Sequence, residues 1–513
     1  MSGKSDTNRR IAKNTLALYA RMLFSMAVTL YTSRVVLNTL GVEDYGLYNV
    51  VGGFVAMFSF FNSAMASATQ RYLNFELGRG DAARLHRVFC TSMNIHALIS
   101  VIVLLLSETV GLWFVYTHLT IPPDRFEAAL WVYQASILAS VVMVMSIPYN
   151  AAIIAHERMG AFAYISVLEV VLKLLIVYLL VVGDVDKLKL YAVLMLLVQV
   201  LIRVIYGRYS GRHFPETHYR LMWDAPLFKE MTGFAGWSLF GNIAAVAFTQ
   251  GLNVLLNMFF GPAVNAARGI AVQVQNAIKG FCTNFQTALN PQITKSYAAG
   301  DMAYMHSLVF TSSKFSYYLL LLLSLPVMLE APLILKWWLG IVPAHTVAFV
   351  RLTLVISIID SLANPLIQAA SATGRIRRYQ SVVGTLLILI LPFSYVALKL
   401  GAPPEGVFVV QLVVFCVAQA ARVWMLRPLI SFSVREYLRK AGLPIAAVTC
   451  ASLVLPLAVY VPLEPSFLRF VAVCAVSAVS VCGAVYAIGL AGGERKFVVD
   501  RVKAVAAKFR KTR

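Results

Sequence analysis

Charge is scarce in this chain, and negative charge is the scarcest. Only 13% of the 513 residues are charged, with 23 Asp or Glu against 44 Lys or Arg. The chain is 59% hydrophobic and its mean hydropathy is +0.75, which excludes a soluble domain of this size and indicates an integral membrane protein. We attribute the net charge of +21 to contact with the anionic cytoplasmic leaflet, not with nucleic acid.

Cysteine is also scarce, and the motifs of enzymes are missing. The six cysteines lie in or beside apolar segments without metal-ligand spacing, so we expect neither disulfides nor a metal site. His156-Glu157 lacks the second histidine of a zinc helix, and no Cys, His and Asp cluster suggests nucleophilic catalysis. The sequence therefore predicts no enzyme and no cofactor, although coupling to H⁺ or Na⁺ stays open.

Long apolar runs are abundant, and they predict about fourteen membrane-spanning helices of roughly 20 residues each. We expect these helices near residues 13–38, 46–71, 88–116, 128–152, 161–182, 188–208, 231–258, 263–290, 306–330, 347–371, 379–399, 405–427, 441–461 and 466–490.

The basic residues between these runs predict the orientation. If the N-terminus is cytoplasmic, the inside connections and tails hold 29 of the 44 Lys and Arg, the outside connections hold 5, and 10 lie within spans. This bias is typical of a protein with both termini and the 375–378 loop in the cytoplasm. We expect a multi-pass protein of the bacterial cytoplasmic membrane.

The chain carries traces of an internal duplication. Gly41 is matched by Gly261, and Gly80-Asp81 by Gly300-Asp301, both at an offset of 220 in the numbering. Pro148 is matched by Pro365 at an offset of 217. Because each half holds six spans, the copies share one orientation and are related by an axis along the membrane normal.

The spans and the duplication together predict an all-α architecture of two pseudo-symmetric six-helix lobes plus two C-terminal helices. The predicted parts are an N-terminal lobe at 1–210, a cytoplasmic linker at 211–230, a second lobe at 231–430, two helices at 431–490 and a basic amphipathic tail at 491–513. The linker is either a strap joining two moving lobes or a plain loop.

Cations inside the spans indicate a functional site. Arg21, Lys173 and Lys279 lie deep in apolar runs, where an ionised side chain costs at least about 2.5 kcal/mol. Such residues face a bundle interior or a wet cavity, and a cavity lined with cations implies an anionic cargo.

Polar side chains recur at helical spacing in three spans. The sets are Arg268, Asn276, Lys279, Thr283, Gln286 and Asn290; Asn242, Thr249, Asn253 and Asn257; and Arg21, Ser25, Thr29 and Thr32. Each stripe is either a cavity wall offering hydrogen bonds or an interhelical packing surface. Arg34, Arg268 and Arg351 lie near outer span ends, where they either snorkel to the interface or form a basic vestibule.

Four residues are candidates for ion coupling. Glu169 and Lys173 form an i, i+4 pair that is either self-neutralising or a cation relay. Glu108 and Asp360 are the other deep acids, and Asp360 is a departure from a purely cationic cavity.

The segments Asn14–Phe54 and Ala68–Asp81, with LGVEDYGLYN from Leu40 to Asn49, resemble the opening of bacterial polysaccharide-repeat-unit flippases. These are Wzx-type exporters of the MOP superfamily, which also holds MATE drug antiporters. The resemblance implies a V-shaped MATE-like bundle with a central cavity. It implies alternating access that passes undecaprenyl-pyrophosphate-linked oligosaccharide from the inner to the outer leaflet.

In that framework Arg21 and Lys279 are the first candidates for binding the pyrophosphate, because a guanidinium binds phosphate bidentately and a lysine ammonium binds it as a point charge. Asn253, Asn276 and Gln286 are candidates for sugar hydroxyls. Two alternatives remain: a cation-coupled MATE-type antiporter of drugs or metabolites, and a membrane enzyme of polysaccharide assembly.

Two further partners are expected. The basic tail at 491–513 either lies on the anionic inner leaflet or is a disordered basic segment. Other polysaccharide-assembly proteins are expected partners.

Overall fold

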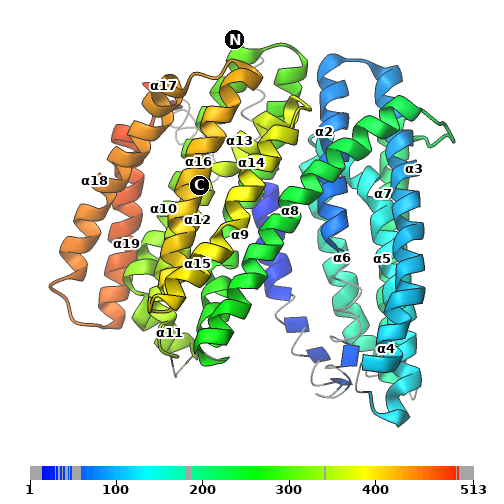
Figure 1. The fold of residues 1–513 in the computed structure, drawn as a ribbon, viewed down its shortest axis with the longest axis horizontal. Coiled ribbons are helices and arrows are strands. Elements are labelled where there is room, and N and C mark those ends of the chain that lie inside the picture. Colours follow the sequence, from blue (N-terminus) through cyan, green and yellow to red (C-terminus); the bar gives the residue numbers. More distant parts are fainter. Residues whose placement is uncertain are drawn as a thin grey trace, which may run out of the picture. The chain divides into compact units, whose positions relative to one another are not determined.

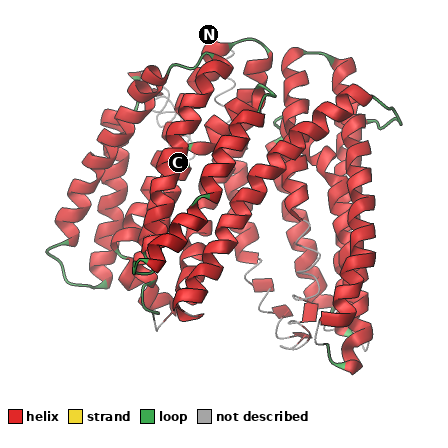
Figure 2. Cartoon of the chain, in the orientation of Figure 1, coloured by secondary structure: helices red, strands yellow, loops and turns green. Residues whose placement is uncertain are grey.

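The computed structural model describes residues 14–28, 31–32, 35–36, 39–40, 44, 47–48, 59–118, 121–180, 186–260, 262–339, 342–492 and 494–495. Throughout this part the chain folds into helices joined by short turns, with no β-strand (Figures 1 and 2). The all-α class is therefore confirmed.

The helices follow the predicted runs closely. Residues 14–28 are helical, and the named α-helices are α2 (Ser59–Arg79), α3 (Ala82–Leu106), α4 (Leu112–His118), α5 (Phe126–Ala155), α6 (Met159–Leu179), α7 (Lys187–His213), α8 (Ala225–Phe260), α9 (Pro262–Ala298), α10 (Met302–Leu329), α11 (Ala331–Leu339), α12 (Thr346–Asp360), α13 (Ala363–Ala372), α14 (Arg377–Ile388), α15 (Ile390–Lys399), α16 (Gly406–Ile430), α17 (Val434–Tyr437), α18 (Leu443–Tyr460) and α19 (Phe467–Ala484). Short 3₁₀ or π-helical turns are η1 (Ser107–Gly111), η2 (Pro123–Arg125), η3 (Pro215–Thr217), η4 (Leu438–Gly442) and η5 (Val485–Gly489).

Within the described ranges, 11 helices are long and apolar enough to cross a membrane. The other three predicted spans are 13–38 and 46–71, which are described only in part, and 263–290. The last is helix α9, which is 37 residues long but too polar to meet the same criterion. A long membrane helix that is this polar needs protein or water along one side.

Side-chain burial on α3 shows how these helices suit a membrane. One face buries His96, Ser100 and Val103, while the opposite face exposes large apolar residues, among them Val101 and Leu105. In water this pattern would be inverted. It fits lipid on the outside and small or polar side chains in the helix contacts.

The chain divides into two compact units. Unit 1 contains residues 1–243, 287–302 and 371–381, and unit 2 contains 244–286, 303–370 and 382–513. Within unit 1, α5 packs against α2, α3 and α7; within unit 2, α16 packs against α12 and α15, and α18 against α19. The lobe boundaries at 210, 230 and 430 remain predictions.

The backbone repeats a residue in the left-handed region at the offsets of the proposed duplication. Gly80 and Gly300, which keep the offset of 220, have φ angles of 75° and 77°. Glu157 and Gly374, which keep the offset of 217, have φ angles of 58° and 75°. The left-handed region is unfavourable for a residue other than glycine, so its recurrence at matched positions agrees with two copies of one helical pattern.

Candidate functional site

A polar face runs along helix α9 in unit 2. Gln273, Asn276 and Thr283 are exposed on it, and the Lys279 side chain beside them is 42% exposed. The opposite side of the helix buries apolar residues such as Ile278 and Cys282. Exposed amide, hydroxyl and ammonium groups at mid-helix cannot face hydrocarbon, so this face borders water or a polar ligand.

Lys279 is the charged centre of this face. Its Nζ lies 2.6 Å from Oδ2 of Asp360, the last residue of α12. Gln275 donates to the Ser357 hydroxyl at 2.6 Å, one turn earlier on each helix. The structure thus brings together a predicted cargo cation and a predicted coupling acid, which the sequence placed in separate roles.

Gln286 lies two turns further along α9. Its Nε2 donates to the Ser316 hydroxyl at 3.0 Å and to the Ser361 carbonyl at 2.9 Å, and its side chain is buried. These contacts tie α9 to α10 and to the end of α12. Gln286 therefore packs helices together, whereas Asn276 has the exposure that a sugar-binding role requires.

Arg422 is a charged residue that the sequence reading did not single out. It is 4% exposed and lies on α16, which packs against α12, the helix that ends at Asp360. Its Nη1 reaches only Oε1 of Gln419, at 3.4 Å, and its Nε has no hydrogen-bond partner among the described residues. With Lys279, Arg422 and Asp360 counted together, this cluster carries two positive charges and one negative. The sequence did offer a signal for Arg422, because it is an arginine inside an apolar run.

Arg268 and Asn253 meet at the contact of α8 with α9. Arg268 donates through Nη1 to Oδ1 of Asn253 and through Nη2 to the Thr249 carbonyl at 2.9 Å, and it is only 5% exposed. The expectation of an interfacial or vestibule arginine is corrected here, because the guanidinium is buried between two helices.

The guanidinium of Arg351 also binds backbone carbonyls. Its Nε donates to the Met328 carbonyl at 2.8 Å and its Nη2 to the Leu329 carbonyl at 3.4 Å, so it caps the end of α10. Cations stabilise the C-terminal ends of helices in this way. Arg34 lies outside the described residues.

In unit 1 the predicted cation and acids fall into three separate groups. The Arg21 guanidinium lies 4.9 Å from the centre of the Phe162 ring. Glu169 and Lys173 are in contact at 2.6 Å, and Gln199 also donates to Glu169 at 3.3 Å. Glu108 accepts from Gln134 at 3.2 Å.

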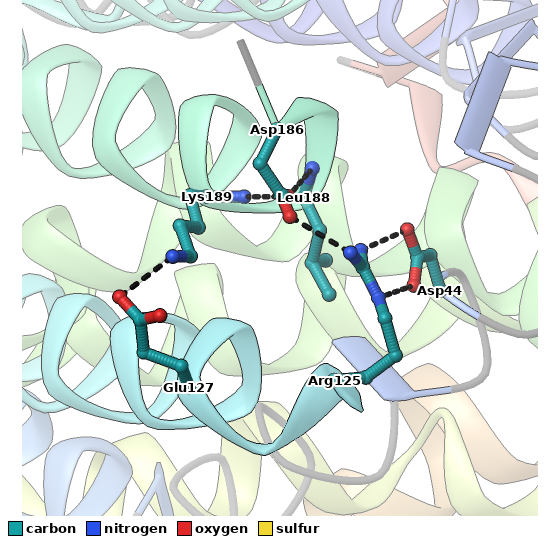
Figure 3. Close-up of polar contacts among 6 residues, drawn as sticks. All are labelled: Asp44, Arg125, Glu127, Asp186, Leu188 and Lys189. Carbon is teal, nitrogen blue, oxygen red and sulfur yellow. Dashed lines mark hydrogen bonds and ion pairs between the residues drawn. The ribbon is translucent and has the colours of Figure 1, made fainter. Parts of the chain in front are cut away.

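Ion pairs at the predicted outer ends of the helices repeat between the halves. In the first half, Arg125 binds Asp44 and lies 2.7 Å from Asp186 (Figure 3). Arg125 and Asp186 are the N-cap residues of α5 and α7. In the second half, the N-cap residues of α12 and α16, His345 and Glu405, are in contact at 2.6 Å.

The N-cap ion pairs keep the offsets of the proposed duplication. Arg125 and His345 are offset by 220 in the numbering, and Asp186 and Glu405 by 219. Figure 3 also shows Lys189 binding Glu127 at 2.7 Å beside the first-half pair. Asp44 belongs to the LGVEDYGLYN motif, which gives that motif a structural reason for its acid.

Two other buried acids have partners that the sequence did not indicate. Glu157 accepts from Gln292 at 2.6 Å and Lys295 at 2.7 Å, all within unit 1. Glu330, which is fully buried, forms a bidentate pair with Arg469 at 2.9 Å. Each pair joins positions far apart in the chain. Among the described residues, no group of three His, Cys, Asp or Glu is placed to hold a metal ion.

No protein-family model matches the chain. The uncharacterized membrane protein EpsK of Bacillus subtilis (strain 168) is 22% identical over 291 residues, which cover 56% of this chain and 57% of that protein. The chain thus spans somewhat more than half the length of this curated relative.

Solved structures show the fold. An outward-facing MATE-family multidrug-resistance transporter of the MOP superfamily matches with a TM-score of 0.71 and 13% identity, over 83% of this chain and 96% of the other. A MATE protein in the straight conformation gives the same values. A MOP superfamily transporter from Pyrococcus furiosus Vc1, noted for the reverse polarity of its binding pocket, gives 0.68 and 14% over 82% and 96%. The chain is a multi-pass membrane protein with a MATE-like fold.

Proposed function

We propose that this protein is a transporter that flips polyprenyl-pyrophosphate-linked oligosaccharide, with undecaprenyl as the carrier, from the inner to the outer leaflet by alternating access. The observation that carries the proposal is the cluster of Lys279, Arg422 and Asp360. Two cations and one carboxylate leave an excess of positive charge beside an exposed polar face. That excess favours an anionic ligand inside the membrane.

The neighbouring groups on α9 suit a glycan attached to such an anion. Gln273, Asn276 and Thr283 present amide and hydroxyl groups on the same face as Lys279. Each sugar hydroxyl that loses water without a new partner costs about 1–3 kcal/mol, so a path for oligosaccharide needs many such groups. The Lys279 ammonium, or the partly buried Arg21 in the first half, would bind phosphate oxygens.

Cation-coupled antiporters have the same fold. The sign of the charge that faces the cargo distinguishes them from a flippase. A carrier of cationic drugs needs an accessible carboxylate, whereas Asp360 is held by Lys279 at 2.6 Å. The P. furiosus relative shows that pocket polarity varies within this fold. The sign of the charge on α9 therefore favours the flippase.

Deleting the gene in its native host tests the proposal. We expect one surface polysaccharide to disappear and its lipid-linked oligosaccharide to accumulate on the inner leaflet. A plasmid carrying the wild-type gene should restore export, and Lys279→Ala should not. Lys336→Ala is the matched control, because it removes an exposed lysine of unit 2 that lies outside the polar face. Intact polysaccharide with a loss of drug resistance would instead support the antiporter.

The proposed place is the bacterial cytoplasmic membrane, with both termini in the cytoplasm. An introduced cysteine at Ala402 should react with an impermeant maleimide from outside, and Arg375→Cys should react only in opened cells. Arg375 is exposed, so protection there reports sidedness; Ser371 is buried and would be protected on either side. The opposite pattern would reverse the orientation. Polysaccharide-assembly proteins and anionic lipid at the C-terminal tail remain proposed partners, the tail lying mostly outside the described residues.

A further inference from the structure

The linker at 211–230 is fixed along helix α3 of the same unit. The backbone N–H of Arg220 donates to the Cys90 sulfur at 3.4 Å, and Asn94 Nδ2 donates to the Met222 carbonyl at 2.7 Å. The Tyr219 hydroxyl donates back to Oδ1 of Asn94 at 2.7 Å. The linker therefore has a set position and is not a loose connection.

The first part of the linker, residues 214–216, is also held by ring stacking and hydrogen bonds. The His156 ring stacks on Phe214 at 4.1 Å, and its Nε2 lies 2.5 Å from Oε1 of Glu216. His86 contacts the Glu216 backbone carbonyl at 2.9 Å. Burial alone would raise the pKa of the Glu216 carboxyl, but the His156 hydrogen bond and the other hydrogen bonds and charges around it outweigh that effect, so this pKa lies below its ordinary value.

The contact with Asn94 sets the depth of the linker relative to the membrane. The first turns of α3 are polar and basic, with Arg84 and Arg87, and the continuous apolar run begins only after His96. Helix α8 changes in the same way after Glu230. Residues 219–223 thus lie where the helices of unit 1 pass from water to hydrocarbon.

At that level the linker exposes large apolar side chains. Tyr219 is 44%, Leu221 86% and Trp223 70% exposed. Tryptophan and tyrosine are enriched at membrane interfaces, where the ring meets acyl chains and its polar edge meets the headgroups. The Leu221 side chain is 86% exposed, so it makes almost no apolar contact within the protein. Acyl chains of lipid would supply that contact.

The charges around these side chains favour anionic lipid. Arg212, Arg220 and Lys229 are exposed, and no carboxylate pairs with them within the described part of the chain. The linker acids are engaged elsewhere: Asp224 lies 3.8 Å from Arg87, and Glu230 lies 3.9 Å from Arg84. The free charge of this surface is therefore positive.

We propose that Tyr219, Leu221 and Trp223 form a linker anchor that inserts into an anionic phospholipid surface. Trp223 and Leu221 enter the boundary of headgroups and acyl chains, and Arg220 and Lys229 bind lipid phosphates. The linker between the two halves is thus held by α3 on one side and by lipid on the other. This role does not depend on what the protein carries.

A fluorescent label at Leu221→Cys in the full-length protein tests the anchor. The background replaces Cys416, Cys450, Cys474 and Cys482 by alanine and keeps the buried Cys90 and Cys282, which a maleimide does not reach. The label is an environment-sensitive maleimide, and the protein is placed in nanodiscs of phosphatidylcholine with or without phosphatidylglycerol. Asp81→Cys is the matched control, an exposed position just before α3 and several turns ahead of Asn94 on the aqueous side.

We expect the label at 221 to emit at shorter wavelength and to be quenched by shallow nitroxide lipids, more strongly with phosphatidylglycerol. The label at 81 should be quenched by aqueous iodide in both discs. Exchanging Arg220→Gln and Lys229→Gln together should remove the dependence on phosphatidylglycerol. Equal iodide quenching at 221 and 81 would overturn the anchor and favour a protein partner, and equal insertion in phosphatidylcholine alone would overturn anionic lipid as its partner.

Discussion

Each half of the molecule contains a lysine paired with a carboxylate inside the membrane, but the two pairs are built differently. Glu169 and Lys173 lie one turn apart on α6, so the pair belongs to a single helix. Lys279 and Asp360 join α9 to α12, and the buried Arg422 adds a further positive charge. The first pair is neutral by itself, whereas the second is part of a cluster with excess positive charge.

The ion pairs between N-cap residues also differ between the two halves. Arg125 is charged at any relevant pH and binds two carboxylates, Asp44 and Asp186. The matching pair of the second half uses His345 with a single carboxylate, Glu405. An ion pair between two N-cap residues therefore lies at matched offsets in both halves, with an arginine and two carboxylates in the first and a histidine and one carboxylate in the second.

The largest expected effect comes from removing the cation of the second-half pair. Lys279→Met should lower export by at least about tenfold, equivalent to ~1.4 kcal/mol, because it removes a proposed cargo contact and leaves Asp360 alone in the membrane. Adding Asp360→Asn should restore the amount of folded protein without restoring export. Export by the double variant at the wild-type rate would mean that the pair is structural. Export per inserted protein in the four variants decides between these outcomes.

The same cycle on the first-half pair should give a smaller net effect. Glu169→Gln or Lys173→Met alone should reduce export several-fold, since each leaves a single charge inside the membrane. The double variant should stay within about twofold of wild type, because Gln199 can still bond to the new glutamine. A double variant as inactive as Glu169→Gln alone would instead assign Glu169 to proton or Na⁺ coupling.

These two pairs also show what the sequence could predict. The helices follow from the length of apolar runs, and the Glu169–Lys173 contact follows from helical spacing, since both are local properties. The partner of Lys279 lies 81 residues away, and no periodicity links the two. For the same reason the sequence treated Asp360 as an independent acid and did not single out Arg422.

The hydrogen-bond partners of the arginines could not be predicted from the sequence either. Arg268 and Arg351 were expected near the interface from their positions in the spans, but a guanidinium can bond to carbonyls and amides within helix contacts instead. The outer pairs could have been found, because Arg125 and His345 keep the offset of 220 that the glycines show. The offsets of the proposed duplication were therefore the most informative long-range signal.

At the outer ends, Arg125→Ala should destabilise the protein more than His345→Ala. The arginine change leaves both Asp44 and Asp186 without their cation, at a cost of about 1–3 kcal/mol, whereas the histidine change frees only Glu405. The thermal midpoint of the purified protein in detergent should fall by several degrees for Arg125→Ala. Arg375→Ala, an exposed arginine without an ion pair in the described structure, is the control. Equal midpoints for the two outer variants would show that the halves do not differ here.

The smallest effect concerns pH. Burial alone would raise the pKa of Asp186, but backbone N–H groups of Lys189 and Leu188 together with Arg125 lower it below its ordinary value. A carboxyl group whose pKa is lowered in the folded state stabilises the fold at any pH above its pKa in the unfolded state, which is about 3.9. This stabilisation is lost only as the pH falls through the pKa of the folded state. The contribution of the first-half pair to the stability of the fold should therefore be constant from about pH 5 to about pH 8.

The thermal midpoint of wild type relative to Asp186→Asn should thus stay constant between about pH 5 and about pH 8 and decrease as the pH falls below about 4. A difference that already changes between about pH 5 and about pH 8 would contradict this assignment of the first-half pair.

Transport under an imposed membrane potential shows whether the protein moves an anion. Purified protein is placed in liposomes with a fluorescent polyprenyl-pyrophosphate-linked oligosaccharide in one leaflet, and potassium gradients set the potential to either sign. Each charge that crosses 100 mV gains about 2.3 kcal/mol, so flipping should be faster when the starting side is negative, and Lys279→Met should abolish it. Exchange of a cationic dye for protons, with no movement of the oligosaccharide at either potential, would contradict the account.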